Sequence, residues 1–338
     1  MDIRELEQRF QDDFERSHVP GAALVLLQNH HVIFARSFGK TSVEESGVPI
    51  TPQTLFLLGS ITKGLTCTAA LRLVEMGKLE LDRLVKDYVP WIKFRRSGAE
   101  NSITVRMLFD HTAGLADIFR VYGHRDADAL GTSIREDFSQ YPFTLPPGIF
   151  PSYSGLHVNL LAFLMEVVTA KPFSDVMQEI LFEPLDMRHT TFDPTIAMTH
   201  ALALGHYLNE NGQPLVIHRF PDNAAFRPSA LGLSCSADLT NFVLLHLHKG
   251  VFQGQRLLSA ETIQLMHTVP PSTTYGLYGS SAGLGFMSEI HNGAYWFGNH
   301  GSAGNYWCKL RIEPETGSAI IALMNCMQLQ VFFFFKLF

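Results

Sequence analysis

Leu58-Gly59-Ser60-Ile61-Thr62-Lys63-Gly64 opens a long apolar run that ends at Glu75-Met76-Gly77-Lys78, where the glycine is typical of a helix stop. If the run is helical, residues three apart share one face, so the hydroxyl of Ser60 and the amine of Lys63 lie side by side at its N-terminus. A serine attacks only with a base beside it, and a neutral lysine can be that base. We therefore interpret Ser60 as a candidate nucleophile. The alternative is an ordinary helix cap.

A second Ser-x-x-Lys pattern, Ser37-Phe38-Gly39-Lys40, serves as a comparison. It follows the strand-like stretch Val32-Ile33-Phe34-Ala35, and Gly39 would break a helix that aligned the two side chains. The context therefore favours the first copy.

The composition indicates a soluble globular protein of two lobes or one large domain. The chain has 338 residues, of which 46% are hydrophobic and 17% charged, and its net charge is −6. No long basic run is present, which argues against nucleic acids and anionic membranes as partners.

The N-terminal segment 1–10 is charged and helix-like, without the apolar core of a secretory signal, so we expect a cytoplasmic protein. The four cysteines lack metal-ligand spacing, which favours free buried thiols over disulfides or a zinc site; they are Cys67, Cys235, Cys308 and Cys326. The phenylalanine-rich end, 331–338, is too short to span a bilayer and would be aggregation-prone if exposed. A buried strand, a surface anchor and an altered reading frame all remain open for it.

The order of patterns along the chain predicts an α+β fold. Gly21 to Leu27 and His31 to Ala35 read as a strand hairpin, residues 58–186 as mainly helical, and the part from Ala201 onward as strands, with Ser318 to Met324 a buried one. We expect one antiparallel sheet built from both termini and flanked by helices (1–57 and 225–338), a mainly helical inserted lobe (58–224), and an active site in the cleft between them.

Tyr153 is the candidate for a second base. It lies in Pro146-Pro147-Gly148-Ile149-Phe150-Pro151-Ser152-Tyr153-Ser154-Gly155, where prolines and glycine fix a loop that can hold a phenol in place. A phenol serves as base only when a cation such as Lys63 stabilises its phenolate. A tyrosine packed at a loop end is the alternative.

Asn299-His300-Gly301-Ser302-Ala303-Gly304, near a C-terminal strand, could supply a polar side chain to the cleft and a backbone N–H for an oxyanion. An ordinary glycine-containing turn is the alternative.

Three other patterns are weaker candidates. Gly279-Ser280-Ser281-Ala282-Gly283 fits a nucleophile elbow but is not followed by a helix. His246 and His248 would diverge on a helix, which favours core or surface histidines over a metal pair. Asp110-His111 are neighbours, and neighbours seldom orient one another as triad members, so we interpret His111 as structural.

Taken together, the motifs resemble those of the serine β-lactamase and penicillin-binding-protein superfamily, in its class C-like branch with esterases and acyltransferases. The likeness covers Val19 to Asn325 and includes Leu108-Phe109-Asp110-His111-Thr112-Ala113-Gly114-Leu115 and Glu183-Pro184-Leu185-Asp186-Met187. It implies an acyl-enzyme route in which Ser60 attacks a carbonyl and Lys63 and Tyr153 move the proton. The backbone N–H of Ser60 would help to hold the oxyanion.

The sequence departs from the family pattern at two motifs. The family's Tyr-x-Asn is here Tyr153-Ser154-Gly155, which lacks the amide. The family's third motif can be aligned in two registers. In one register it is Asn299-His300-Gly301, with Ser302 giving the second oxyanion N–H and His300 still facing the cleft. In the other, a short deletion places His300 first. Neither register supplies the lysine that binds a β-lactam carboxylate, so strong antibiotic hydrolysis is not expected.

We therefore expect a serine acyl-hydrolase that acts on a small ester, thioester or amide through acyl-Ser60, without a metal or an organic cofactor. An acyltransferase of the same fold, such as one in secondary metabolism, is the alternative within the class, because either water or a bound alcohol can take the acyl group. A non-catalytic binding protein that retains the fold is the alternative from another class.

Overall fold

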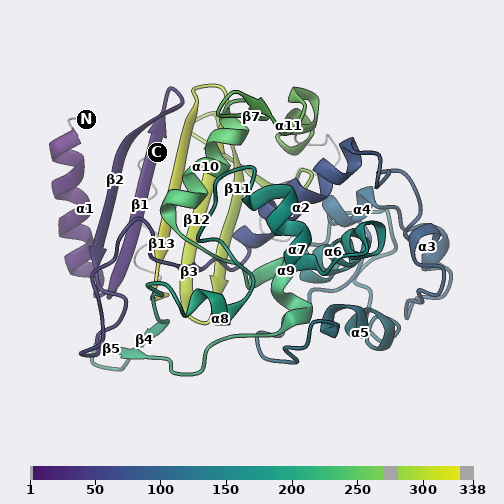
Figure 1. The fold of residues 1–338 in the computed structure, drawn as a ribbon, viewed down its shortest axis with the longest axis horizontal. Helices are drawn as coiled ribbons and strands as arrows, with labels where there is room; N and C mark the ends of the chain where they lie inside the picture. The colour runs from purple at the N-terminus through teal and green to yellow at the C-terminus, as the bar shows by residue number, and fades with distance from the viewer. Residues whose placement is uncertain (1–2, 269–280, 328–338) are drawn as a thin grey trace.

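The computed structural model describes residues 3–268 and 281–327, and its centre is a seven-stranded sheet in the order β2-β1-β13-β12-β11-β10-β9 (Figure 1). Every neighbouring pair in this sheet is antiparallel. The strands are β1 (Gly21–Gln28), β2 (His31–Gly39), β9 (Ser281–Ala282), β10 (Met287–His291), β11 (Ala294–Ala303), β12 (Tyr306–Glu313) and β13 (Ser318–Met324). The prediction of an antiparallel sheet built from both ends of the chain is confirmed.

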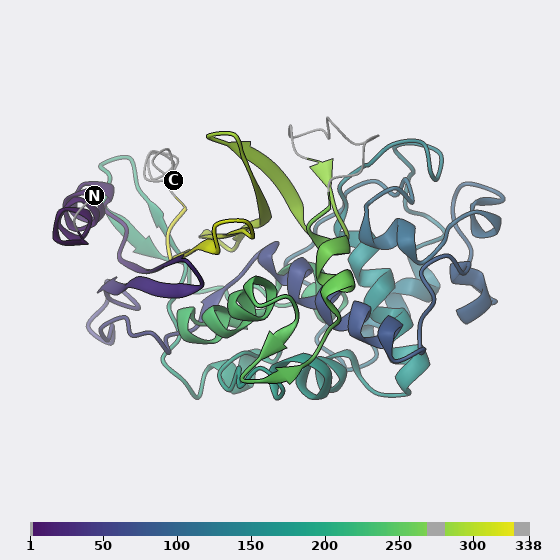
Figure 2. The same ribbon diagram turned by 90° about the horizontal axis from the view of Figure 1, so that it is seen from above.

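The helices form a second group that packs mainly on one face of this sheet and extends beyond its edge (Figures 1 and 2). They are α1 (Ile3–Ser17), α2 (Ile61–Glu75), α3 (Val85–Tyr88), α4 (Arg106–Phe109), α5 (Ala129–Glu136), α6 (Gly155–Thr169), α7 (Phe173–Met177), α8 (Pro194–Ala197), α9 (Arg227–Ala230), α10 (Ser236–Leu247) and α11 (Ala260–Met266). Short 3-10 turns cover Ala99–Asn101 and Ala224–Phe226, and a π-helical turn covers Gln178–Phe182. Three small two-stranded sheets complete the fold, with β3 (Phe56–Leu57) on β6 (Leu233–Ser234), β4 (His206–Leu208) on β5 (Pro214–Val216), and β7 (Val251–Phe252) on β8 (Gln255–Arg256).

The middle of the central sheet, formed by β1, β13 and β12, is buried on both faces. In β1 the side chains alternate, so that Ala23, Val25 and Leu27 enter the large core shared with the helices. Ala22, Leu24 and Leu26 enter a smaller cluster with α1. We call the side that carries α1 the outer face and the side that carries α2 and α10 the inner face.

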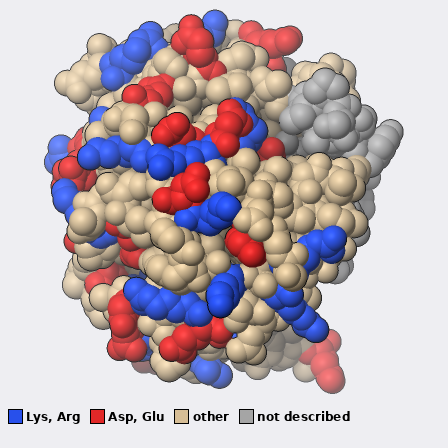
Figure 3. All heavy atoms as spheres, turned by 90° about the vertical axis from the view of Figure 1, so that its right-hand side faces the viewer, with Lys and Arg blue, Asp and Glu red and all other residues tan. Residues whose placement is uncertain are grey.

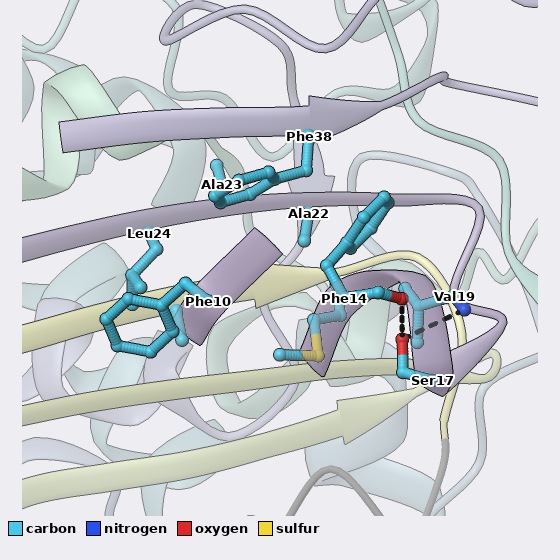
Figure 4. Close-up of a pocket in the computed structure, with 10 residues that line it drawn as sticks. Phe10, Phe14, Ser17, Val19, Ala22, Ala23, Leu24 and Phe38 are labelled. Atoms are coloured by element: carbon cyan, nitrogen blue, oxygen red, sulfur yellow. Dashed lines mark hydrogen bonds between the residues drawn. The ribbon is translucent and has the colours of Figure 1, made fainter. Parts of the chain in front are cut away.

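Helix α1 rests on the outer face through aromatic side chains. Phe10 lies against Phe34. Phe14, drawn in Figure 4, stacks on Phe38 with ring centroids 5.3 Å apart. The helix ends where the Ser17 hydroxyl donates to the Phe14 carbonyl at 2.7 Å. An apolar pocket remains between the helix and the sheet.

The helical prediction holds for much of residues 58–186 and fails farther along. Helix α2 follows Ser60 and ends before Gly77, as predicted, and α6 contains the apolar stretch Leu160 to Val168. However, α9, α10 and α11 interrupt the part expected to be strands. Helix α10 is buried on most sides, so its sequence lacks the amphipathic period that distinguishes a helix from a buried strand.

The division into a sheet part (1–57 and 225–338) and a helical part (58–224) stays a prediction, because one buried cluster includes residues from both. The C-terminal segment 331–338 lies outside the described residues, as do Gly279 and Ser280 of the elbow-like pattern. Among the described residues, no helix has the length and apolar character that crossing a membrane requires. Basic and acidic side chains are interspersed over the surface seen in Figure 3.

Asn325, directly after β13, ties that strand to the start of β1 and to the segment after β2. Its side chain is fully buried, its oxygen accepts a hydrogen bond from the Gly21 N–H at 2.8 Å, and its amide donates to the carbonyls of Lys40 and Thr41 at 3.2 Å each. A buried polar group must keep its partners, so this one side chain satisfies three backbone groups.

We predict that Asn325→Ala lowers the free energy of unfolding by about 2 kcal/mol, since it leaves the buried N–H of Gly21 without an acceptor. Urea denaturation measures the change. Asn211→Ala, in the exposed turn between β4 and β5, is the matched control and should cost less than about 0.5 kcal/mol. Equal effects of the two variants would contradict the role given to Asn325.

Candidate active site

Ser60 occupies the N-cap position of α2, but its side chain makes no capping hydrogen bond. Its backbone is already helical, with φ −67°, and its hydroxyl oxygen accepts a hydrogen bond from the Lys63 amine at 3.0 Å. The ordinary helix cap considered above therefore does not describe this serine. The hydroxyl and the amine lie side by side, as their spacing predicts.

Lys63 is buried, with 4% of its surface exposed. Besides Ser60, its amine donates to the backbone carbonyl of Ser229 in α9 at 2.9 Å. In residues 3–268 and 281–327, no carboxylate lies within ion-pair distance of this amine. Two uncharged oxygens, of the Ser60 hydroxyl and the Ser229 carbonyl, thus position the amine.

Tyr153 joins this pair from the loop before α6. The Lys63 amine lies 4.8 Å from the centroid of its ring. The next residue, Ser154, caps α6, because its hydroxyl oxygen accepts from the Leu156 N–H at 3.1 Å. The same hydroxyl donates to the Ala116 carbonyl at 3.0 Å, which ties the loop to the segment after His111.

Two buried histidines support the Tyr153 loop from behind. The Leu115 N–H donates to Nε2 of His157 at 3.3 Å, so the proton of His157 must sit on Nδ1. That Nδ1 lies 3.1 Å from Nδ1 of His111, which then acts as acceptor, and the ring of His111 lies 4.8 Å from that of Tyr153. The Ser154 N–H points at the same nitrogen at 3.4 Å. The interpretation of His111 as structural is confirmed.

This arrangement requires both rings to be neutral. Burial lowers the pKa of His157 to about 3 and also holds the pKa of His111 well below its usual value, where the charge of the neighbouring ring acts in the same direction. The pair therefore keeps its hydrogen bonds throughout the neutral pH range.

The backbone of β11 passes against the start of α2. An ideal Cβ built on Gly301 would lie 1.8 Å from the Leu58 carbonyl oxygen and 3.3 Å from the Ser60 nitrogen. One built on Gly59, which has φ +56°, would lie 2.3 Å from the Ser302 nitrogen. Only glycine fits at either place, and the close approach brings the backbones of Ser60 and Ser302 together.

The side chains of the third motif lie on opposite faces of β11. Asn299 is buried on the inner face, where its amide donates to the Gly285 carbonyl at 3.2 Å, and Gly301 faces the start of α2. His300 instead lies on the outer face, near Glu289 and the ring of Trp307. The expectation that His300 faces the cleft was wrong, because side chains alternate along a strand and the register is regular here.

Sequence reasoning missed two residues beside the site. The Ser229 carbonyl, which receives the Lys63 amine, could not be found from residue type. Asp117 accepts from the Gly155 N–H at 2.9 Å, and a Cβ on Gly155 would lie 3.1 Å from the Ser229 hydroxyl and 3.8 Å from the Asp117 carboxylate. At Gly155, where the family's second motif has an asparagine, the space that a side chain would enter is thus bordered by a hydroxyl and a carboxylate.

The weaker candidates have structural positions. His246 is buried among aromatic rings and His248 is on the surface, while the Asp110 carboxylate accepts from the backbone and hydroxyl of Thr112. All four cysteines are free and buried.

One trio among the described residues, His189, Cys235 and Asp238, has the spacing of metal ligands. However, one Asp238 oxygen already accepts from the backbones of His189 and Thr190 and from the Thr190 hydroxyl. Burial also raises the pKa of the Cys235 thiol, and a metal needs the thiolate. Cys235 caps α10, and Asp238 in its first turn holds the backbone of His189, so we interpret the trio as structural rather than as a metal site.

A beta-lactamase family model matches residues 4–334. The chain belongs to the beta-lactamase family. Penicillin-binding protein 4 of Amycolatopsis lactamdurans is 27% identical over 325 residues, which cover 94% of this chain and 84% of that protein. Protein flp of Staphylococcus aureus is 25% identical over 246 residues, and the match covers 72% of this chain but about half of flp, 49%.

Solved structures with a similar fold match nearly the whole chain. The octameric penicillin-binding protein homologue from Pyrococcus abyssi has a TM-score of 0.79 at 25% identity, covering 96% of this chain and 74% of that one. EstCE1, described as a hydrolase with promiscuous acyltransferase activity, has a TM-score of 0.77 at 22% identity, covering 94% and 91%, which shows the shared fold. The family acts on small-molecule esters or amides.

We predict that Gly301→Ala separates β11 from the start of α2, because the new methyl group would meet the Leu58 carbonyl. Labelling of Ser60 by a fluorophosphonate probe should slow at least about 100-fold, as when an oxyanion donor is displaced. Gly131→Ala in α5, whose Cβ would meet the flexible end of Arg135 and the ring of Phe163, is the control and should label normally. Normal labelling of Gly301→Ala would refute the close approach.

The buried histidines predict an acid-sensitive fold. Between about pH 6.5 and the folded pKa of His157 near 3, the unfolded chain binds a proton at this ring that the folded chain does not, so stability decreases as the pH falls. One such ring contributes a slope of about 1.4 kcal/mol per pH unit. In urea unfolding between pH 6 and pH 4.5, His157→Gln should flatten the slope. His218→Gln, an exposed control, should leave it unchanged.

Proposed function

We propose that the protein is a serine acyl-hydrolase that forms an acyl-Ser60 intermediate on small esters, thioesters or amides. The observation that supports this most is the 3.0 Å contact between the Lys63 amine and the Ser60 hydroxyl, in a serine that caps nothing. A hydroxyl with a base in hydrogen-bond reach is the geometry that nucleophilic catalysis requires.

The proposed acylation step requires a neutral Lys63 amine, to which the Ser60 O–H donates, in the reverse direction of the hydrogen bond in the structure. As the serine oxygen bonds to the substrate carbonyl carbon, the proton passes to the amine and the carbonyl oxygen gains a negative charge. The backbone N–H groups of Ser60 and Ser302 are the proposed donors to that oxygen, because the glycines bring these two backbones together.

Tyr153 is the proposed carrier of the proton to the leaving group. Its ring lies beside the Lys63 amine, so a protonated Lys63 stabilises a phenolate there. In the second step a water takes the place of the leaving group, gives its proton to the same pair and releases the acid, which restores Ser60.

The substrate recognition proposed here differs from that of a β-lactamase. Asn299, in the position expected for a carboxylate-binding lysine, is neutral and already bonded to the Gly285 carbonyl. The place left by Gly155 is bordered by the Asp117 carboxylate, which repels an anionic substrate group. Neutral or cationic esters and amides therefore suit the site better than a β-lactam carboxylate.

The test is hydrolysis of p-nitrophenyl acetate together with labelling by a fluorophosphonate. Ser60→Ala should abolish both, and Lys63→Ala should lower kcat/KM by about 10²- to 10⁴-fold, the range of a general base. Ser37→Ala, in the second Ser-x-x-Lys copy, is the matched control and should remain fully active, because Ser37 lies on β2 away from Lys63.

Turnover that survives in Ser60→Ala would exclude the acyl-Ser60 mechanism. A wild-type protein that neither turns over nor labels would instead be a binding protein that retains the fold. Product analysis in the presence of an alcohol separates the hydrolase from an acyltransferase, since only transfer yields the new ester.

A further inference from the structure

Asp117 is an acidic side chain beside the site that the proposed acyl-Ser60 route does not use. It is exposed, and one of its carboxylate oxygens accepts a hydrogen bond from the Gly155 N–H at 2.9 Å. In residues 3–268 and 281–327, no lysine, arginine or histidine lies within ion-pair distance of this carboxylate, whereas the exposed Asp82, for example, is paired with Arg106. Asp117 therefore presents a carboxylate with which no cation of the described chain pairs.

Two neighbouring residues, Gly155 and Ser229, connect Asp117 to the reacting groups. Gly155 begins α6, two residues after Tyr153. An ideal Cβ on Gly155 would lie 3.8 Å from the Asp117 carboxylate and 3.1 Å from the Ser229 hydroxyl. The backbone carbonyl of the same Ser229 accepts from the Lys63 amine at 2.9 Å. Asp117 thus borders the site on the side of Ser229 and the Tyr153 loop.

Glycine at position 155 leaves this carboxylate open to a ligand. A longer side chain there would enter the space beside Ser229 and Asp117, and the amide of an asparagine would offer its N–H groups to the carboxylate. With glycine, the backbone N–H is the only group of the described residues that donates a hydrogen bond to Asp117. That bond also orients the carboxylate, and an acceptor that is already oriented loses little freedom when a ligand binds.

We propose that Asp117 determines substrate specificity by binding an ammonium group of the substrate, so that amino-acid esters and amides are the preferred class. This assignment rests on the proposed acyl-Ser60 route. An ammonium group supplies the positive charge and the N–H donors that the carboxylate lacks, and hydrogen bonds between ionised partners are about twice as strong as neutral ones. The ammonium group takes no part in the bond changes and only anchors the substrate while Ser60 attacks the carbonyl carbon.

The short path from Asp117 to the reacting groups explains why the class is small amino-acid derivatives. Only Gly155 and Ser229 lie along the contacts that lead from the carboxylate to Lys63. A substrate that reaches both Asp117 and Ser60 therefore has its ammonium group a few bonds from the carbonyl that is attacked.

Three methyl esters of nearly equal shape test the proposal. They are the esters of alanine, isobutyric acid and methylmalonic acid, which carry an ammonium, a methyl and a carboxylate group on the same carbon. Hydrolysis releases acid that a pH-stat measures at about pH 7, where the amine of the alanine ester is mainly protonated. The readout is the kcat/KM of the alanine ester divided by that of the isobutyrate ester, because comparing this ratio between variants cancels the different intrinsic reactivity of the two esters.

Asp117→Asn should lower this ratio about tenfold, since it removes the charge but keeps a side-chain oxygen that can accept from the Gly155 N–H. It should also raise kcat/KM for the methylmalonate ester, whose carboxylate is no longer repelled. A folding defect would lower all three rates, so opposite changes identify a charge effect. Asp12→Asn, which changes the net charge equally at an exposed position of α1 on the outer face, is the matched control and should alter neither quantity.

Salt provides a second readout that a purely structural role of Asp117 would not move. Because the carboxylate is exposed, ions in solution screen its attraction for the ammonium group. The ratio should fall in the wild type between about 20 mM and about 500 mM salt, and it should stay nearly constant in Asp117→Asn.

A ratio that Asp117→Asn leaves unchanged, or that Asp12→Asn lowers as much, would overturn the role of Asp117 and leave the acyl-Ser60 route intact. A wild-type protein that a fluorophosphonate labels at Ser60 but that hydrolyses none of the three esters would overturn the substrate class alone. A wild-type protein that neither labels nor hydrolyses would overturn the proposed function and this inference with it.

Discussion

The passage of β11 against the start of α2 is the constraint on which the site depends. Gly301 lies so close to the Leu58 carbonyl that no Cβ fits between them, and Gly59 meets the Ser302 nitrogen in the same way. The two elements belong to distant parts of the chain, yet their backbones are in direct contact. The position of the nucleophile is therefore set by main-chain packing, which is far stiffer than contacts between side chains.

The side chains of the site are held in place by neighbouring residues that are themselves fixed by further contacts. Lys63 is aimed by the Ser229 carbonyl, and the Tyr153 loop is held by the capping serine that follows it and by His111 behind it. Each support is a hydrogen bond or a ring contact in the interior, where little room for rearrangement exists. A preorganised site of this kind needs little reorganisation when charge develops on a substrate.

The parts of the site that could be predicted are those set by local geometry. Ser60 and Lys63 are three residues apart on a helix, and no tertiary information is needed to place them together. The orientation of His300 depends on strand alternation and on where the register starts, which a single sequence does not reveal. The Ser229 group that holds Lys63 is a backbone carbonyl, which every residue type has.

The same distinction applies to the fold. The hairpin of β1 and β2 and the buried strand β13 were recognisable from apolar runs bounded by turn residues. Helix α10 could not be recognised in this way, because a helix that is surrounded by protein on most sides lacks a continuous polar face. The ion pairs of Lys309 and Arg311 with Glu289 on the outer face also became visible only when strand pairing placed the three residues together.

The hydrogen bond between Gly21 and Asn325 links residues 304 positions apart. Translation proceeds at about 5 to 20 residues per second, so β13 is synthesised roughly 15 to 60 s after the hairpin of β1 and β2 with which it pairs. Until then one edge of β1 offers unpaired backbone groups to any passing chain. We therefore expect the nascent protein to depend on chaperones that shield this early hairpin.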